Sequence, residues 1–329
     1  MRILITGGAG FIGAHFTRAA CAAGKQVVAL DDLSGGAPLP LPPQAVLVRG
    51  DIGDRALVQR LCRQHRIEAV VHFAGKIQVG ESVKRPEIYY DVNLVRSLSL
   101  LEAAQQSGVQ HFVFSSTAAV YGVPQQVPIP ESAAQEPINP YGATKLAFEK
   151  ALQAYGQAYG VRWAALRYFN AAGAHPDGTL RENHQPETHL IPLILDTGLQ
   201  RRPPLEVFGT DYPTRDGTCV RDYIHVCDLA DAHLAALDAL AAGRPSLICN
   251  LGTGRGFTVQ EVLAAAAQLL GRPIPHRVSP RRPGDPAELC ADAGRARELL
   301  GFSPRRSDLP TLIEDALRSR VGRGTDSPS

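Results

Sequence analysis

The chain has 329 residues, which is enough to bury a large core in one two-lobed unit or in two domains. Its formal net charge is +2 and the two signs are interspersed, so we expect neither nucleic acid nor an anionic membrane as a partner. The six cysteines are scattered, without a Cys-x-x-Cys pair or a His-rich cluster. This pattern predicts no disulfide framework, no zinc site and no other metal centre.

The N-terminus carries an apolar run at residues 2–6 that predicts a strand. A strand in this place leaves no room for the charged leader and apolar core of a signal peptide. No apolar run elsewhere reaches the length that spans a membrane. We therefore expect a cytoplasmic protein.

Glycines follow this strand at Gly7, Gly10 and Gly13, and a helical pattern then continues to Ala23. Strand, glycine turn and helix together indicate a dinucleotide site, because glycines let the backbone approach a pyrophosphate and a helix N-terminus offers free N–H groups. A tight turn that only packs the helix on the strand is the alternative interpretation.

The second predicted strand, residues 26–30, ends at Asp31 and Asp32. A carboxylate at the position of Asp31 accepts hydrogen bonds from ribose hydroxyls and repels a 2′-phosphate, so Asp31 favours NAD over NADP. We interpret Asp32 as a solvated turn residue.

Further strand and helix units follow. Strands are predicted at residues 45–48 and 69–73, with a helix between them that Asp54 caps. We interpret His72, inside the second of these apolar runs, as a buried core residue. Repeated units of this kind predict an α/β fold with a Rossmann-type, doubly wound parallel sheet.

A tyrosine and a lysine share one face of a predicted helix that covers residues 140–159. Asn139 suits the helix cap and Pro140 the first helical position, which places Tyr141 and Lys145 one turn apart. A free phenol has a pKa near about 10, so we expect the lysine ammonium to stabilise the phenolate and make the tyrosine a base. The same spacing also arises by chance on solvated helices.

A strand at residues 111–114 delivers the hydroxyl cluster of Ser115, Ser116 and Thr117 about two dozen residues before Tyr141. The glycine turn, this cluster and the tyrosine–lysine pair, in this order, resemble the extended short-chain dehydrogenase/reductase family, and within it the UDP-glucose 4-epimerase branch.

The resemblance covers nearly the whole chain, and it implies two domains. The first, residues 1–169, binds NAD, and the second, residues 170–329, is a smaller C-terminal α/β domain that binds the UDP-sugar substrate. Segments near 219–251, including a strand at 247–251, return to the first domain. Members of the family usually form homodimers through two long helices, read here as 89–107 and 140–159.

The resemblance also assigns roles to individual residues. Thr117, Tyr141 and Lys145 are the expected catalytic residues. NAD contacts are implied at Gly7, Gly10, Phe11, Ile12, Gly13, Asp31, Asp51, Ile52, Phe73, Ala74, Asn93, Tyr141, Lys145 and Tyr168. Substrate contacts are implied at Thr117, Asn170, His189, Leu190, Phe208, Arg221, Arg282, Asp285 and Leu289.

The chain departs from the family pattern in two places. Some members have a lysine two residues beyond Gly75, whereas here Lys76 follows it directly, so a contact between Lys76 and the cofactor stays open. The small residue usually found after Asn93 is replaced by Arg96 and Ser97. In the Arg-Arg-Pro-Gly-Asp run that ends at Asp285, the arginine forks suit a diphosphate, although we read Arg281 as solvated. The Gly-, Ser- and Pro-rich tail after Arg320 is expected to be disordered.

The residues after Thr117 distinguish between related activities. Nucleotide-sugar 4,6-dehydratases carry an Asp-Glu pair here, because eliminating water needs a further acid and base, whereas this chain has Ala118 and Ala119. The resemblance therefore implies interconversion of UDP-galactose and UDP-glucose through a 4-ketose with tightly bound NAD. Leu289 stands at the position that gates a 2-acetamido group. The alternatives are another UDP-sugar (N-acetylhexosamine, pentose or uronate), a decarboxylase or reductase, or a non-catalytic NAD-sensing protein.

Overall fold

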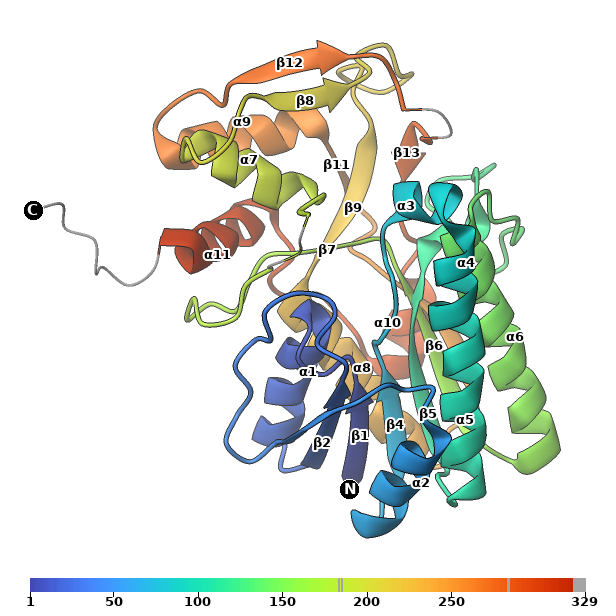
Figure 1. Cartoon of the computed structure of the whole chain (residues 1–329). Coiled ribbons are helices and arrows are strands. Elements are labelled where there is room, and N and C mark those ends of the chain that lie inside the picture. Colours follow the sequence, from blue (N-terminus) through green and yellow to red (C-terminus); the bar gives the residue numbers. More distant parts are fainter. Residues whose placement is uncertain (183, 185, 283–284, 322–329) are drawn as a thin grey trace, which may run out of the picture.

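Seven parallel strands form the central sheet, in the order β10-β6-β5-β4-β1-β2-β3 (Figure 1). The computed structural model describes residues 1–182, 184, 186–282 and 285–321. In chain order the strands of this sheet are β1 (Arg2–Thr6), β2 (Gln26–Asp31), β3 (Val46–Arg49), β4 (Ala69–His72), β5 (His111–Thr117), β6 (Arg162–Tyr168) and β10 (Leu247–Leu251). This is the Rossmann-type sheet that the sequence predicts, and β5 extends through the whole hydroxyl cluster.

Helices cover both faces of this sheet, because its strands are apolar on both sides. Ile3 and Ile5 pack in one buried cluster with residues of the first-face helices, whereas Leu4 between them packs in a second cluster on the opposite face. The first face carries α1 (Phe11–Ala22) and α8 (Val226–Ala241), and the second carries α2 (Arg55–Gln64), α5 (Ser97–Gln106) and α6 (Pro140–Tyr159).

The caps predicted from the sequence are present. The Asn139 side chain accepts a hydrogen bond from Gly142 N at 2.9 Å, and Pro140 occupies the first turn of α6. The Asp54 side chain caps α2 by accepting from Leu57 N at 2.9 Å. His72 is a core residue as predicted, only 1% exposed, and its two ring nitrogens lie 2.6 Å from the Thr6 hydroxyl and 2.9 Å from the Ser97 hydroxyl.

The helix predicted at residues 89–107 is longer and less regular than expected. It begins with α4 (Pro86–Tyr89), widens into a π-helical stretch, η1 (Tyr90–Arg96), and continues as α5, while a separate short helix, α3 (Val79–Lys84), precedes it. The wide turn buries Asn93, which is 2% exposed. Stretches of this kind are frequent at functional sites.

A second, smaller α/β lobe sits over the carboxyl edge of the main sheet (Figure 1). Strand β9 (Val220–His225) pairs with β7, β11 and β13, and β8 pairs with β12. The remaining bounds are η2 (Ala118–Tyr121), β7 (Asn170–Ala172), α7 (Leu190–Gly198), β8 (Leu205–Phe208), β11 (Gly256–Thr258), α9 (Val259–Leu270), β12 (His276–Ser279), β13 (Glu288–Leu289), α10 (Gly294–Leu300) and α11 (Leu309–Val321). The tail expected to be disordered lies outside the described residues from position 322 onward.

Within the described part of the chain, no helix combines the length and the apolar character needed to cross a membrane. All six cysteines are free thiols.

A buried ion pair joins helix α6 to strand β6. Arg167 Nε donates to Glu149 Oε1 at 3.0 Å, and the two side chains are 0% and 3% exposed. The Ser116 hydroxyl also donates to Glu149, and Arg167 donates to the Tyr121 hydroxyl at 2.9 Å. Burial alone would lower the pKa of Arg167, but Glu149 raises it above its usual value. The pair therefore stays charged inside the core.

Replacing Glu149 by glutamine should lower the free energy of unfolding by about 3–5 kcal/mol, because it leaves the Arg167 charge buried without its partner. Equilibrium denaturation with urea measures this. The matched control is Glu68→Gln, which removes an ion pair with Arg2 in which both side chains are about two-fifths exposed and should cost about 0–1 kcal/mol. Equal losses in the two variants would contradict the assigned role of the buried pair.

Candidate active site

A cavity of about 1400 Å³ runs along the carboxyl edge of the central sheet and under the second lobe. All of the predicted site residues line it except Asn93 and Leu190. Leu190 begins α7 and packs against the core of the second lobe, so the predicted direct contact between Leu190 and the substrate is not supported by its position.

The glycine turn packs so closely on neighbouring backbone that side chains do not fit at two of its positions. Gly7 has a φ of 68°, and a Cβ there would lie 2.7 Å from Ala74 N. A Cβ on Gly13 would lie 2.0 Å from the Gly7 carbonyl oxygen. Gly10 precedes α1 without a capping side chain, so the first N–H groups of the helix face the cavity uncapped. This cradle fits the pyrophosphate of a dinucleotide.

The end of β2 presents a carboxylate that fits the ribose of the same ligand. Asp31 accepts hydrogen bonds from Ala9 N at 3.0 Å and from Leu33 N at 2.9 Å, which fix its side chain at the cavity wall. A second carboxylate, Asp51, lines the cavity beyond it and forms an ion pair with Arg96. Arg96 also binds Asp91, so the arginine that departs from the family pattern holds the Asp51 turn in place.

The tyrosine, the lysine and the threonine predicted to be catalytic all line this cavity. Lys145 is 4% exposed, donates to the Ser115 carbonyl oxygen at 3.0 Å, and lies 6.0 Å from the centre of the Tyr141 ring. The start of α6 touches the end of β5 closely, since a Cβ on Gly142 would lie 2.4 Å from the Ala119 carbonyl oxygen. This contact brings the Tyr141 and Thr117 hydroxyls within reach of one ligand atom.

The pKa values differ in part from the sequence prediction. Burial raises the pKa of the Tyr141 phenol, and its interaction with the Thr117 hydroxyl opposes that rise. Burial lowers the pKa of Lys145 to about 8, and Glu149 one turn further along the helix opposes that fall. In the protein alone the Tyr141 pKa is thus raised rather than lowered, and the Lys145 ammonium donates to the Ser115 carbonyl oxygen. Stabilisation of the phenolate by Lys145 stays a prediction.

Asn93 supports the site from behind. Its side-chain oxygen accepts from Lys76 N at 2.7 Å and its amide group donates to Lys76 O at 2.9 Å. Both bonds fix the backbone after Gly75 and leave the Lys76 side chain at the cavity wall. Asn93 therefore positions the wall rather than lining it.

Arginines and an aromatic ring form the wall in the second lobe. Arg221 forms an ion pair with Asp285, and the Arg282 guanidinium lies 4.0 Å from the centre of the Phe208 ring. Leu289 on β13 is the strand partner of Arg221 on β9. Pro283 and Gly284 of the same motif lie outside the described residues. Arg281 pairs with the exposed Asp211, which agrees with its interpretation as a solvated residue.

The polar residue at the border of the two lobes is also held in place. Asn170 on β7 lines the cavity and donates to the Asp222 carbonyl oxygen at 3.2 Å. Tyr168, two residues earlier, shares a hydrogen bond with the Ser115 hydroxyl.

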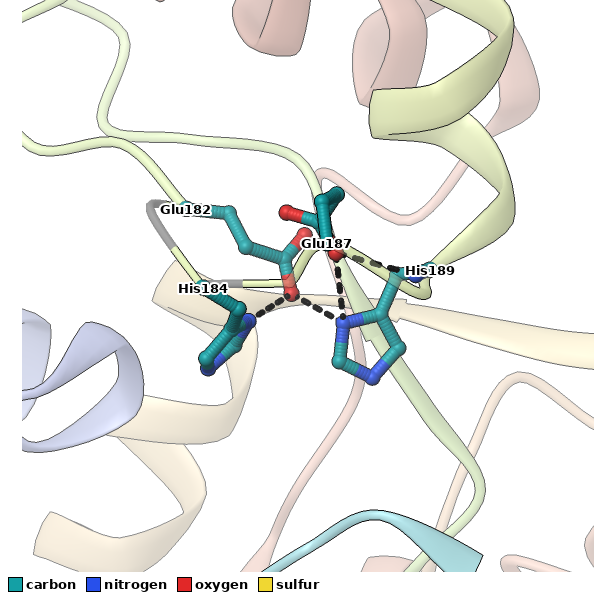
Figure 2. Close-up of side chains that lie close together, drawn as sticks. All are labelled: Glu182, His184, Glu187 and His189. Atoms are coloured by element: carbon teal, nitrogen blue, oxygen red, sulfur yellow. Dashed lines mark hydrogen bonds and ion pairs between the residues drawn. The ribbon is translucent and has the colours of Figure 1, made fainter. Parts of the chain in front are cut away.

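Four further side chains at the cavity wall were not predicted as a group. Glu182, His184, Glu187 and His189 lie together in the loop before α7 (Figure 2), and only His189 was predicted to be a site residue. The signal was present in the sequence, as two glutamates and two histidines within eight residues. Burial alone would raise the pKa of Glu182, but the neighbouring histidines lower it to about 2.

The doubly wound sheet, with its reactive tyrosine and lysine at the carboxyl edge, defines a class of enzymes that bind a dinucleotide across this edge and act on a second ligand beside it. The chain matches the NAD dependent epimerase/dehydratase family over residues 3–252, and it belongs to that family. The resemblance drawn from the motifs is confirmed.

Characterised relatives are similar over nearly their whole length. The UDP-glucose 4-epimerase of Azospirillum brasilense is 50% identical over 316 residues, which cover 96% of this chain and 91% of the relative. The crystal structure of UDP-glucose 4-epimerase from Brucella ovis in complex with NAD is 46% identical, with a TM-score of 0.92 over 96% of this chain and 97% of that one. The Bifidobacterium longum enzyme in complex with NAD⁺ and UDP is 36% identical, with a TM-score of 0.91 over 98% of each chain.

Replacing Asp31 by asparagine should weaken NAD binding about 10- to 100-fold, because the loss of a charged acceptor costs about 1.5–3 kcal/mol. Titration of the cofactor-depleted protein with NAD measures this. Asp32→Asn is the matched control, since Asp32 is exposed and its one hydrogen bond among the described residues comes from Ser34 N. An unchanged Kd for the Asp31 variant would contradict the assignment of the ribose site.

Proposed function

We propose that the protein interconverts UDP-galactose and UDP-glucose by reversible oxidation at C4 of the sugar. The observation that carries this proposal is that Thr117, Tyr141 and Lys145 line one cavity together with the glycine turn and Arg221. The cradle at one end of the cavity fits a dinucleotide, and the arginines at the other end fit a sugar nucleotide. The named activity of the A. brasilense relative supports the same assignment.

NAD is the cofactor that fits the glycine turn and Asp31, and when bound there it accepts a hydride from C4 and later returns it. Tyr141 takes the proton of the C4 hydroxyl, directly or through the Thr117 hydroxyl, and Lys145 stabilises the phenolate. Ala118 and Ala119 cannot exchange protons, so no group stands ready to eliminate water. The product of this half-reaction is a 4-ketose.

Inversion requires that the sugar turn while its nucleotide stays bound. Arg221 and Arg282 suit the diphosphate, because guanidinium groups bind phosphate oxygens in a bidentate manner. Phe208 offers a flat surface for the uracil ring. Strong binding of UDP and weak binding of the hexose allow the opposite face of the ketose to meet the reduced cofactor, after which Tyr141 returns the proton.

We propose two domains, one for each of the two ligands. Residues 1–169 bind NAD and residues 170–329 bind the UDP-sugar, with segments near 219–251 returning to the first domain. The pairing of β10 with β6 and the packing of α8 beside α1 support this return. Strand β9, by contrast, belongs to the sheet of the second lobe.

We also propose a cytoplasmic homodimer. Val83, Tyr90 and Val95 are 62%, 45% and 56% exposed on the segments α3 and η1, which pack beside α6. These apolar side chains suit pairing with a second copy. Six free cysteines fit a reducing compartment. Sedimentation velocity at micromolar concentration should give the dimer mass, and a monomer mass would contradict the pairing.

Replacing Tyr141 by phenylalanine should lower kcat at least about 100-fold, because it removes the proton acceptor and donor. The assay follows UDP-glucose formation from UDP-galactose with no added cofactor. The control is Tyr155→Phe, near the C-terminal end of the same helix and not among the residues that line the cavity. This variant should retain activity. If wild-type protein forms no UDP-glucose even with added NAD, the proposed activity is contradicted. The alternatives are then activity on another nucleotide sugar or NAD sensing.

The rate should fall as the pH rises through about 8, since Lys145 loses its proton there and no longer stabilises the phenolate. Glu149→Gln removes the carboxylate that raises the Lys145 pKa, so the fall should move to lower pH in that variant. Profiles of kcat against pH, recorded where both proteins are folded, measure the shift. A rate constant that is insensitive to pH in this range, or an unshifted profile, would contradict this role of Lys145.

Leu289 should restrict the sugar range, because it lines the cavity on β13 and packs against the cluster that contains Ala118, the residue after Thr117. Leu289→Ala should raise kcat/KM for UDP-N-acetylglucosamine relative to UDP-glucose about tenfold or more. Leu193→Ala, at another cavity-lining leucine, is the control. An unchanged ratio of the two kcat/KM values would contradict this role of Leu289. Other residues would then determine the sugar range, including activity on pentose and uronate substrates.

A further inference from the structure

The loop between β7 and α7 brings four metal-ligating side chains together (Figure 2). Glu182, His184, Glu187 and His189 each offer one ligand atom, and these four atoms all lie within 4.8 Å of one another. All four residues line the cavity. None of them is needed for the proton transfers at Tyr141.

The candidate ligand atoms lie close to one another. Glu182 Oε1 lies 3.1 Å from His184 Nδ1 and 2.5 Å from His189 Nδ1, and Glu187 Oε1 lies 3.4 Å from His189 Nδ1. A tetrahedral Zn²⁺ site with bonds of about 2.0–2.1 Å has edges of about 3.3 Å between its ligands. The separations of 3.1 Å and 3.4 Å match such an edge, and the 2.5 Å contact must lengthen by about 0.8 Å to admit an ion at the centre of the group.

The two histidine Nδ1 atoms lie beside carboxylate oxygens. His184 Nδ1 and His189 Nδ1 are both buried, and among the described residues neither makes a hydrogen bond of acceptable geometry, although each lies close to the Glu182 carboxylate. Buried polar atoms in this condition call for a partner. A cation between the rings and the carboxylates satisfies both nitrogens at once.

The two carboxylates of the cluster also favour a bound cation. The Glu182 side chain is only 3% exposed and that of Glu187 is 15% exposed, so two carboxylates are held in a largely dry place. A divalent cation neutralises both. Glu187 is also fixed before any ion arrives, because its Oε1 accepts from Thr188 N at 2.8 Å and His189 N at 2.9 Å.

We propose that Glu182, His184, Glu187 and His189 form a site for a zinc-type divalent cation. Imidazole nitrogens together with carboxylate oxygens suit Zn²⁺ better than Mg²⁺, which prefers oxygen ligands alone. Four protein ligands make a closed, structural site, so the ion fixes the loop that forms one wall of the cavity. This site departs from the sequence expectation of no metal, and it does not depend on the proposed reaction.

Metal binding to the full chain tests the proposal directly. Protein freed of metal with a chelator is titrated with Zn²⁺ against a chromophoric competitor, and separately with Co²⁺, whose visible absorption reports tetrahedral coordination. Wild type should bind one Zn²⁺ per chain. Changes to residues that only support the metal ligands weaken binding about 10- to 100-fold. His184→Gln removes a ligand itself, so it should weaken binding by more than that. His184→Cys, which keeps a zinc ligand, should restore binding.

His175→Gln is the matched control, because His175 is another partly buried loop histidine beside a carboxylate, Asp177, and lies outside the cluster. It should bind Zn²⁺ like wild type. Circular dichroism establishes that each variant is folded, and Glu187→Gln is the second test if His184→Gln is not. No saturable Zn²⁺ in wild type, or equal affinity in wild type and both cluster variants, would overturn the proposal whatever the enzymatic activity.

Discussion

The buried ion pair between Glu149 and Arg167 fixes where helix α6 meets the central sheet, and the reactive groups depend on that meeting point. Glu149 lies one helical turn after Lys145, and Arg167 lies beside Tyr168 on β6. The pair also binds the Ser116 hydroxyl at the end of β5. A charge buried here is stable only with its partner in place, so the helix and the two strands are held in a single register.

This register sets the chemistry of the tyrosine and the lysine. Lys145 reaches the Ser115 carbonyl only because α6 lies against the end of β5, and the Glu149 carboxylate keeps its pKa from falling further. The Tyr141 phenol lines the same cavity, and its burial raises its pKa. In the protein alone, both groups therefore favour their protonated forms at neutral pH.

The parts that follow from local rules were predictable. Alternating apolar residues and the glycine turn predict the sheet, and Asn139 with Pro140 predicts the start of α6 within one residue. Asp31 was assigned from its distance along the chain after the glycines, and the structure places it at the cavity wall. Each of these depends on neighbours in the sequence or on a spacing that a strand and a turn impose.

The parts that were missed depend on contacts across the fold. Glu149 and Arg167 are 18 residues apart and belong to different elements, so no periodicity joins them. The π-helical stretch around Asn93 contacts a distant segment, because the Asn93 side chain bonds to the Lys76 backbone 17 residues earlier. The pKa of Tyr141 follows from burial, which the helix pattern alone does not give.

The central claim is that C4 loses a hydride and regains the same hydride within one protein. The most direct measurement uses UDP-galactose carrying deuterium at C4 of the sugar, incubated with purified protein without added cofactor. The label should return to C4 of the UDP-glucose formed, with none lost to water. Loss of the label to solvent, or entry of solvent hydrogen at C4, would contradict the account.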